Sequence, residues 1–326
     1  MTLDIIVPHY HEPQEVVTPL LESIKLQGGV EFKDIQVLIV NDGTDVPLDR
    51  EKFNGYPFKV KYYEKKHEGV SAARNYGLDK SKADYVMFCD FDDRFLNLYG
   101  LYLVFSAMQK GSDAITSSFV EEHKNEDGSY KIVRRDNDAT FVHGKIYRRE
   151  YLVKNNLRFN PKLTIHEDGY FNCLAMLSAD TKDYITTPFY LWCWGKNTVS
   201  QKGNTIFVLQ TYDHVMDTRI AICEQAMERG FIDESYDFIV KTVLDSYYDF
   251  NKPEYLDPAN KDLVKKAEKA FKRFYMQFRD LYHEANMMKV REIAYVARQN
   301  AFVNGLNMEK WTLHDWLNHI VKEVEE

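Results

Sequence analysis

Residues 85–89, Tyr-Val-Met-Phe-Cys, form an apolar run that leads directly into three carboxylates, Asp90, Asp92 and Asp93. The run has the length and composition of a buried strand. Negative charge rarely gathers at the end of such a strand unless a cation or a cationic ligand binds there. On a continuing strand, Asp90 and Asp92 point to the same side and can share one divalent ion. The stretch predicts a metal that holds a phosphate-bearing substrate, with an acidic turn as the alternative.

Strand and helix patterns alternate along the first ninety residues. Residues 3–10 and 35–40 are short β-branched runs that end at proline, asparagine or glycine. Between them, residues 16–27 carry apolar side chains at helical spacing, and a second helix is expected at residues 69–78. This β-α-β-α-β order predicts a mostly parallel sheet covered by helices.

Three polar clusters follow the predicted strands, at residues 8–12, 41–43 and 90–93. In open α/β sheets, ligands bind in the crevice outside the carboxyl ends of the strands. We therefore expect the three clusters to meet in one crevice.

Four motifs in this part of the chain resemble those of family 2 glycosyltransferases of the GT-A fold, including bacterial or phage transferases of cell-surface glycans. They are Pro8-His9-Tyr10, Asn41-Asp42-Gly43-Thr44, Ala73-Arg74-Asn75 and Asp90-Phe91-Asp92-Asp93, and they occur in the family's order. The resemblance implies a Rossmann-like mixed, mostly parallel sheet flanked by helices. It also implies transfer of a sugar from a nucleotide-sugar donor, most simply a UDP-sugar.

Each motif has a physical use in holding such a donor. Asp42 can accept the ring N–H of the base, and Tyr10 can form an apolar wall beside it. Arg74 offers a planar set of donors near the base or the diphosphate. The resemblance adds Pro8 and Glu12 to the donor site. An ordinary turn at residues 41–43 and a surface ion pair at Arg74 are the alternatives.

The carboxylates after the strand at residues 85–89 are the expected metal site, for Mn²⁺ or Mg²⁺. Asp92 is the first choice for direct coordination. Asp90 is expected to bind the metal through water or to accept hydrogen bonds from the ribose.

A second acidic site, Glu167-Asp168-Gly169-Tyr170-Phe171, matches the family segment that carries the catalytic base. Sugar transfer with inversion needs a carboxylate that takes the proton of the acceptor hydroxyl while the diphosphate leaves from the opposite face. The resemblance assigns this role to Asp168. Glu167 would orient the site or bind a sugar hydroxyl. A solvated helix N-terminus is the alternative, because acidic residues favour that position.

Residues around the second acidic site are expected to face the sugar or the acceptor. Gly144 would let the backbone approach the sugar. His143 would contact the diphosphate or the acceptor, or would be a structural histidine. Family members often have an arginine close to the position of Trp194, so Lys196 is the expected substitute for binding the diphosphate. Of the two neighbouring tryptophans, we expect Trp194 at the site and Trp192 in the core.

From about residue 205 the pattern becomes helical, so we expect a GT-A domain over residues 1–204 and a helical appendage over 205–326. The appendage would serve acceptor recognition, packing or oligomerisation. Residues 258–300 contain ten Lys or Arg and five Asp or Glu, although the chain has a net charge of −8. This basic stretch predicts contact with a membrane surface, an anionic polymer or nucleic acid, or an ordinary solvated helix face. The last amphipathic segment, residues 310–324, would pack on the body, form an oligomer contact or lie on a membrane.

The four cysteines show no paired spacing, and neither a signal peptide nor a membrane-spanning run is evident, so a cytoplasmic location, with optional peripheral contact at the inner membrane face, is expected. The sequence thus predicts a metal-dependent inverting glycosyltransferase acting on a glycan or cell-wall polymer. Two rival hypotheses are a glycosyltransferase acting on nucleic acid and a non-catalytic protein that binds sugar nucleotides.

Overall fold

The computed structural model describes residues 1–125, 127–194, 206–285 and 312–322, together with the single positions 295, 299 and 324. The chain forms two compact units, Met1–Lys202 and Gly203–Glu326. Each unit is described separately below. Among the described residues, no helix combines the length and the apolar composition needed to cross a membrane.

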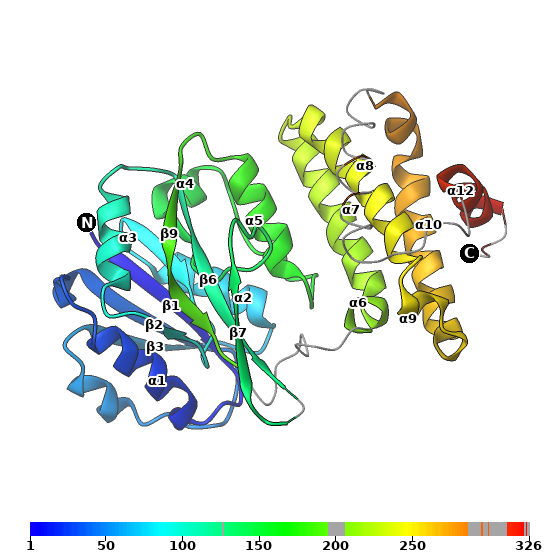
Figure 1. Cartoon of the computed structure of the whole chain (residues 1–326). Coiled ribbons are helices and arrows are strands. Elements are labelled where there is room, and N and C mark those ends of the chain that lie inside the picture. Colours follow the sequence, from blue (N-terminus) through cyan, green and yellow to red (C-terminus); the bar gives the residue numbers. More distant parts are fainter. Residues whose placement is uncertain are drawn as a thin grey trace. The chain divides into compact units, whose positions relative to one another are not determined.

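The first unit is a mixed sheet with helices on both faces (Figure 1). The strands lie in the order β3-β2-β1-β4-β8-β6-β9-β5, with β7 paired to β6. The strands are β1 Leu3–His9, β2 Ile35–Asn41, β3 Lys59–Glu64, β4 Tyr85–Phe88, β5 Arg94–Phe95, β6 Ala114–Lys124, β7 Tyr130–Arg135, β8 Ile146–Arg148 and β9 Lys182–Trp192. The helices are α1 Gln14–Lys25, α2 Val70–Lys80, α3 Gly100–Met108, α4 Arg149–Lys154 and α5 Glu167–Leu177, with 3-10 turns at Phe32–Asp34 and Arg50–Gly55.

The predicted fold class is confirmed. Strands β3, β2, β1 and β4 pair in parallel, as the β-α-β-α-β pattern required. Strand β8 then joins β4 and β6 by antiparallel pairs, and β6 and β9 are parallel. Because β8 pairs with β4, the chain passes the end of β4 again after β7. Residues 138–143 and α5, which flank β8 in sequence, therefore lie close to the acidic turn at residues 90–93.

Successive side chains of β1 point to opposite faces of the sheet, and each face is covered by a different layer of helices. Ile5 belongs to the apolar cluster that contains Leu20 of α1 and Val104 of α3. Ile6 points to the other face, where α2 approaches so closely that a Cβ on Gly77 would lie 2.4 Å from the Ile6 side chain. Gly77 therefore allows α2 to lie directly on β1, and Arg74, one turn earlier on this helix, is held at the edge of the sheet.

The second unit is helical, with α6 Phe207–Gln210, α7 Tyr212–Glu228, α8 Ile232–Asp249, α9 Pro253–Leu256, a 3-10 turn at Pro258–Asn260, α10 Lys261–Glu284 and α12 Leu313–Lys322. Its core joins apolar residues of α7, α8, α10 and α12. Trp316 and Ile320 of α12 are buried in this core. The prediction of an oligomer contact through the last helix is therefore not supported, because the described apolar face of that helix is already covered within its own unit. Residues 287–304 also carry apolar side chains at three- and four-residue spacing, which predicts a helix; apart from positions 295 and 299, they lie outside the described residues.

Candidate active site

A cavity of about 400 Å³ opens where β1, β2 and β4 end. The expected crevice is therefore present, and the three polar clusters meet in it together with the first turn of α5. The predicted site residues that line it are Pro8, Tyr10, Glu12, Asp42, Arg74, Asp90, Asp92, His143, Glu167 and Asp168.

Arg74 connects three carboxylates at the bottom of this cavity. One terminal nitrogen lies 2.8 Å from Glu167 Oε1 and 2.6 Å from Asp168 Oδ1, and the other lies 2.8 Å from Asp90 Oδ1. Its side chain is only 3% exposed. We expected Arg74 beside the base or the diphosphate; in this structure its terminal nitrogens are committed to the carboxylates instead. Arg74 thus joins the acidic turn to α5, although Asp90 and Glu167 are 77 residues apart in sequence.

This arrangement changes the proton affinity of Asp168. Burial raises the pKa of Asp168 to about 8; Arg74 opposes this rise, and the charges on Glu167 and Asp90 add to it. Burial by itself would lower the pKa of Arg74, but the surrounding carboxylates raise the pKa of Arg74 above its usual value. The backbone N–H of Val142 donates to Asp168 Oδ2 at 3.3 Å. Asp168 is therefore an oriented carboxylate with the raised pKa that suits a general base.

The acidic residues lie on a turn and not on a continued strand. Strand β4 ends at Phe88, so the alternation argument used for Asp90 and Asp92 was wrong, although both residues do line the cavity. Asp93 points into the interior. Its carboxylate accepts hydrogen bonds from the Tyr190 hydroxyl at 2.5 Å and from the Cys193 N–H at 2.9 Å.

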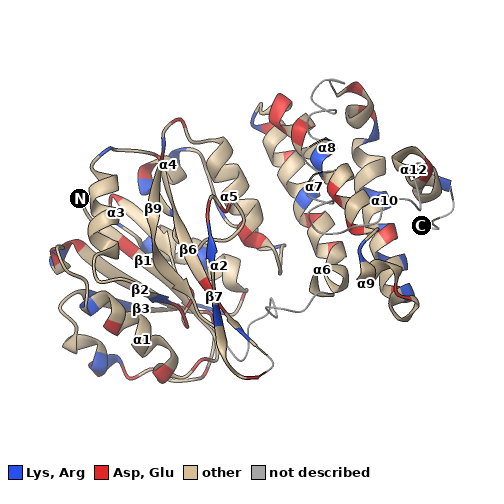
Figure 2. Ribbon diagram, in the orientation of Figure 1, with Lys and Arg blue, Asp and Glu red and all other residues tan. Residues whose placement is uncertain are grey.

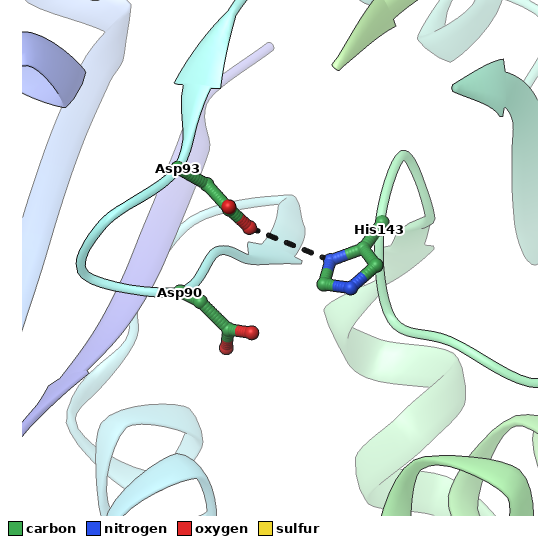
Figure 3. Close-up of side chains that lie close together, drawn as sticks. All are labelled: Asp90, Asp93 and His143. Carbon is green, nitrogen blue, oxygen red and sulfur yellow. Dashed lines mark ion pairs between the residues drawn. The ribbon is translucent and has the colours of Figure 1, made fainter. Parts of the chain in front are cut away.

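His143 lies beside this turn. Its Nδ1 is 3.6 Å from Asp93 Oδ2, as Figure 3 shows, and one possible ligand atom each of Asp90, Asp93 and His143 lie within 4.8 Å of one another. The imidazole is 1% exposed and stacks on Tyr190 and Trp192. This burial favours the structural alternative for His143 over a contact with the acceptor.

The carboxylates of the acidic turn are suitable ligands for a divalent cation. Asp90 and Asp92 place carboxylate oxygens, the ligands that Mn²⁺ and Mg²⁺ prefer, on the cavity wall. Asp93 is less suited to the role, because it is fully buried and already accepts two hydrogen bonds. The assignment of Asp92 as the direct ligand stays a prediction.

The other end of the cavity is built around Asp42. Its carboxylate accepts the N–H groups of Glu68 and Gly69 and forms ion pairs with Lys65 at 2.7 Å and His67 at 2.9 Å. Asp42 therefore holds the segment before α2 in place, and its contact with a base N–H stays a prediction. Sequence reasoning missed Lys65 and His67, although the Lys-Lys-His-Glu-Gly run at residues 65–69 marked a polar helix entry.

Tyr10 lies beside this segment at the cavity. Its ring stacks on the imidazole of His67, with 4.4 Å between the ring centroids. The Tyr10 N–H is fixed by Glu12, whose carboxylate accepts it at 2.8 Å. The predicted apolar wall for a base is therefore available as a stacked pair.

Two predicted site residues lie elsewhere. Gly144 is buried at φ 66°, and a Cβ there would lie 2.3 Å from the Ser117 hydroxyl oxygen. The glycine is needed for this turn and for close packing, not for approach to a sugar. Trp192 is buried in the core, as expected, and it also lines the cavity. The Trp194 N–H donates to Glu122, and Trp194 is not among the described residues that line the cavity, so its place at the site stays a prediction. Strand β9 ends at Trp192, after which Cys193 turns toward Asp93. Lys196 lies outside the described residues.

The known proteins to which this chain is similar include glycosyltransferases, the class of enzyme that its sequence motifs predicted. The family "Glycosyl transferase family 2" matches residues 4–180. Glycosyltransferase GlyA of Streptococcus pneumoniae is 24% identical over 266 residues, which cover 69% of this chain and 37% of that protein. Minor teichoic acid biosynthesis protein GgaB of Bacillus subtilis is 31% identical over 125 residues, 37% of this chain and 12% of that protein. This chain thus spans well under two thirds of the length of these relatives.

A solved structure shares the fold across both units. It is S. aureus TarS 1–349 in complex with UDP-GlcNAc, which matches with a TM-score of 0.60 at 18% identity and covers 92% of each chain. The family match spans more than half of the chain and contains the acidic turn, Asp168 and all of the described cavity-lining residues except Trp192. The chain therefore belongs to the family 2 glycosyltransferases.

Proposed function

We propose that this enzyme transfers one sugar from a UDP-sugar to a hydroxyl of a cell-surface or cell-wall glycan, with inversion and with a divalent metal. The observation that carries the proposal is the placement of Asp168. It lies in the wall of the same cavity as Asp90 and Asp92, and Arg74 joins it to Asp90. A donor bound in this cavity could thus meet the base, Asp168, on one side and the metal-binding carboxylates at its diphosphate on the other. The relation to TarS, which has been crystallised with UDP-GlcNAc, supports the choice of nucleotide.

In this mechanism, Asp168 takes the proton of the acceptor hydroxyl while the new C–O bond forms at the anomeric carbon. The bond between that carbon and the diphosphate oxygen breaks, and the electron pair leaves with the diphosphate on the opposite face. A metal bound at Asp92 and Asp90 would supply positive charge to the departing diphosphate. Arg74 and the Val142 N–H each bind one oxygen of Asp168, which fixes the direction in which this carboxylate accepts the proton.

A donor screen tests the proposal. Thermal stabilisation and slow hydrolysis are measured with UDP-, GDP-, CDP- and TDP-sugars, with and without Mn²⁺. We expect a metal-dependent response confined to UDP-sugars, because ligand binding to the folded state raises its stability. A response to a different nucleotide would contradict the donor assignment. No response from the folded protein would contradict the sugar-nucleotide site itself.

We expect Asp92→Asn to weaken binding of Mn²⁺ and of the UDP-sugar by about tenfold or more, because a neutral amide replaces one negatively charged ligand. Calorimetric titration of Mn²⁺, and of the donor at saturating metal, measures both effects. Asp45→Asn, an exposed acid beyond β2, is the matched control and should bind as the wild type does. Unchanged donor affinity in Asp92→Asn would remove the metal role from this residue.

The second unit has a basic surface suited to an anionic acceptor. A cavity of about 480 Å³ beside α10 is lined by Lys266, Lys269, Lys272 and Arg273, with Asp213 the acidic residue among them. The blue segments of the α10 ribbon in Figure 2 mark its Lys and Arg positions. Lys266 and Arg273 form ion pairs with aspartates of α7, so part of the charge is neutralised. We propose that this row contacts a phosphate-bearing polymer, which agrees with the similarity to a protein of teichoic acid biosynthesis.

The double variant Lys269→Ala with Lys272→Ala tests this contact. We expect kcat/KM for a polyanionic acceptor to fall about tenfold, since each exposed charge contributes up to about 1 kcal/mol. Donor hydrolysis should not change. Lys241→Ala on α8, which removes an exposed ion pair, is the control. Equal loss with a neutral acceptor would contradict the proposed contact, and salt-sensitive binding of DNA alone would favour the nucleic-acid hypothesis.

A further inference from the structure

The segment between β7 and β8 forms one wall of the cavity and contacts the catalytic base. Thr140 and Phe141 line the cavity, and the next residue, Val142, donates its backbone N–H to Asp168 Oδ2. The position of this segment therefore affects both the shape of the site and the orientation of the base.

The segment is organised around Asp138. One oxygen of its carboxylate accepts the N–H groups of Thr140 at 2.8 Å and Phe141 at 2.9 Å. The Thr140 carbonyl in turn accepts the side-chain amide of Asn172 on α5 at 2.8 Å. The amide oxygen of Asn172 accepts the hydroxyl of Tyr147 at 2.7 Å. These bonds attach the segment to the helix that carries Asp168.

Lys145 lies at the centre of this arrangement. Its ammonium donates to the Phe141 carbonyl and is 3.7 Å from Asp138 Oδ1. The side chain is 1% exposed, and burial lowers the pKa of Lys145 to about 8, with Asp138 and Asp168 opposing this change. An apolar side chain would avoid the cost of burying a charge. A buried cation therefore calls for an explanation beyond stability.

We propose that Lys145 is a positioning residue for the base: its ammonium holds residues 138–142 against Asp168, and its positive charge favours the ionised form of that carboxylate. This inference rests on the proposed function, in which Asp168 takes the acceptor proton. The mechanism described above does not otherwise use Lys145.

The charged and titratable groups around Asp168 come from four elements. Arg74 lies on α2, Asp90 on the turn after β4, Glu167 on α5 itself, and Lys145 and Tyr147 at the start of β8. Arg74 and Lys145 favour the ionised base, and the two carboxylates disfavour it. Removing the charge of Lys145 should therefore raise the pKa of Asp168.

The test compares Lys145→Met with Asp138→Asn. The methionine has a similar length and no charge, and the asparagine keeps an oxygen that can accept the N–H groups of Thr140 and Phe141. We expect Lys145→Met to lower kcat about tenfold with little change in KM for the donor. The acid limb of its rate–pH profile should move up by about one unit. Asp138→Asn should move the acid limb by less than that, because Lys145 stays in place.

An upward shift of the acid limb with an unchanged KM would not arise from loss of structure alone. Lys110→Met, which removes an exposed ion pair with Asp183, is the control and should leave the profile unchanged. If Lys145→Met folds and the acid limb does not move, Lys145 has no role in positioning the base. If Lys145→Met fails to fold, Lys145→Gln, which carries no charge and can still donate to the Phe141 carbonyl, decides by itself: an upward shift supports the proposal and no shift overturns it.

The wild type distinguishes this inference from the proposed function. A folded wild-type chain that transfers no sugar from any donor would contradict the proposed function, and the inference with it. An active wild type with unshifted variants would contradict the role of Lys145 alone.

Discussion

We expect Asp168→Asn to lower the rate of sugar transfer about 10⁴-fold and still to bind the donor, because a neutral amide cannot take the proton of the acceptor hydroxyl. The substitution keeps the shape of the side chain, and its oxygen can still accept the Val142 N–H. Arg74 keeps its contacts with Glu167 and Asp90. Initial rates with saturating UDP-sugar and calorimetric donor titration together measure the two parts of this prediction.

The wild type should show the matching pH dependence. A general base acts in its ionised form, and the pKa of Asp168 is raised to about 8 by burial. The rate should therefore increase with pH through this region and level off above it. Asp79→Asn, whose carboxylate is 61% exposed in an ion pair with Arg158, is the control and should transfer normally.

Glu167→Gln separates the two neighbouring acids. It should reduce transfer much less than Asp168→Asn, because Glu167 is expected to orient the site. Normal turnover in Asp168→Asn, together with an inactive Glu167→Gln, would move the role of the base to Glu167.

Arg74→Met should cost about 3–5 kcal/mol in the free energy of unfolding of the first unit, since three carboxylates lose the buried cation that they share. The size of this loss depends on pH. Arg74 lowers the pKa of Asp168, so without Arg74 that pKa rises further above its unfolded value. The penalty is then greatest where the carboxylates are ionised and shrinks as acid protonates them.

Native-state hydrogen exchange of the β1 and β4 amides at pH 8 and pH 5 measures this effect in the unit concerned. Arg50→Met is the control, because its ion pair with Glu64 is exposed and should contribute at most about 1 kcal/mol. Equal protection of Arg74→Met and wild type at pH 8 would mean that the three carboxylates do not depend on this arginine.

Membership in the family confirms the enzyme class predicted from the motifs, so it favours that class over the rival hypothesis of a non-catalytic binding protein. The expected contact of the basic helices with a membrane has no support in the structure. The acceptor, the metal and the inversion of configuration stay proposals with the tests given above.

Local pattern was enough to predict the parallel part of the sheet. Apolar runs of strand length, separated by helical periodicity, allow few topologies, because parallel strands need a helical crossover. The same rule brought the ends of β1, β2 and β4 together, so the cavity was expected at residues 8–12, 41–43 and 90–93. The second unit was predictable as helical for the same local reason.

The sequence by itself therefore determined the strand and helix order, the family and the acidic groups of the site. Only the tertiary structure decided which way side chains point after a strand ends. Asp93 turns inward because Tyr190, 97 residues later, donates to it, and Arg74 joins α5 because Asp168 lies 94 residues away in sequence but 2.6 Å away in space. Periodicity describes only neighbours along the chain. Partners of this kind are chosen by burial, because most buried polar groups in a folded protein form hydrogen bonds.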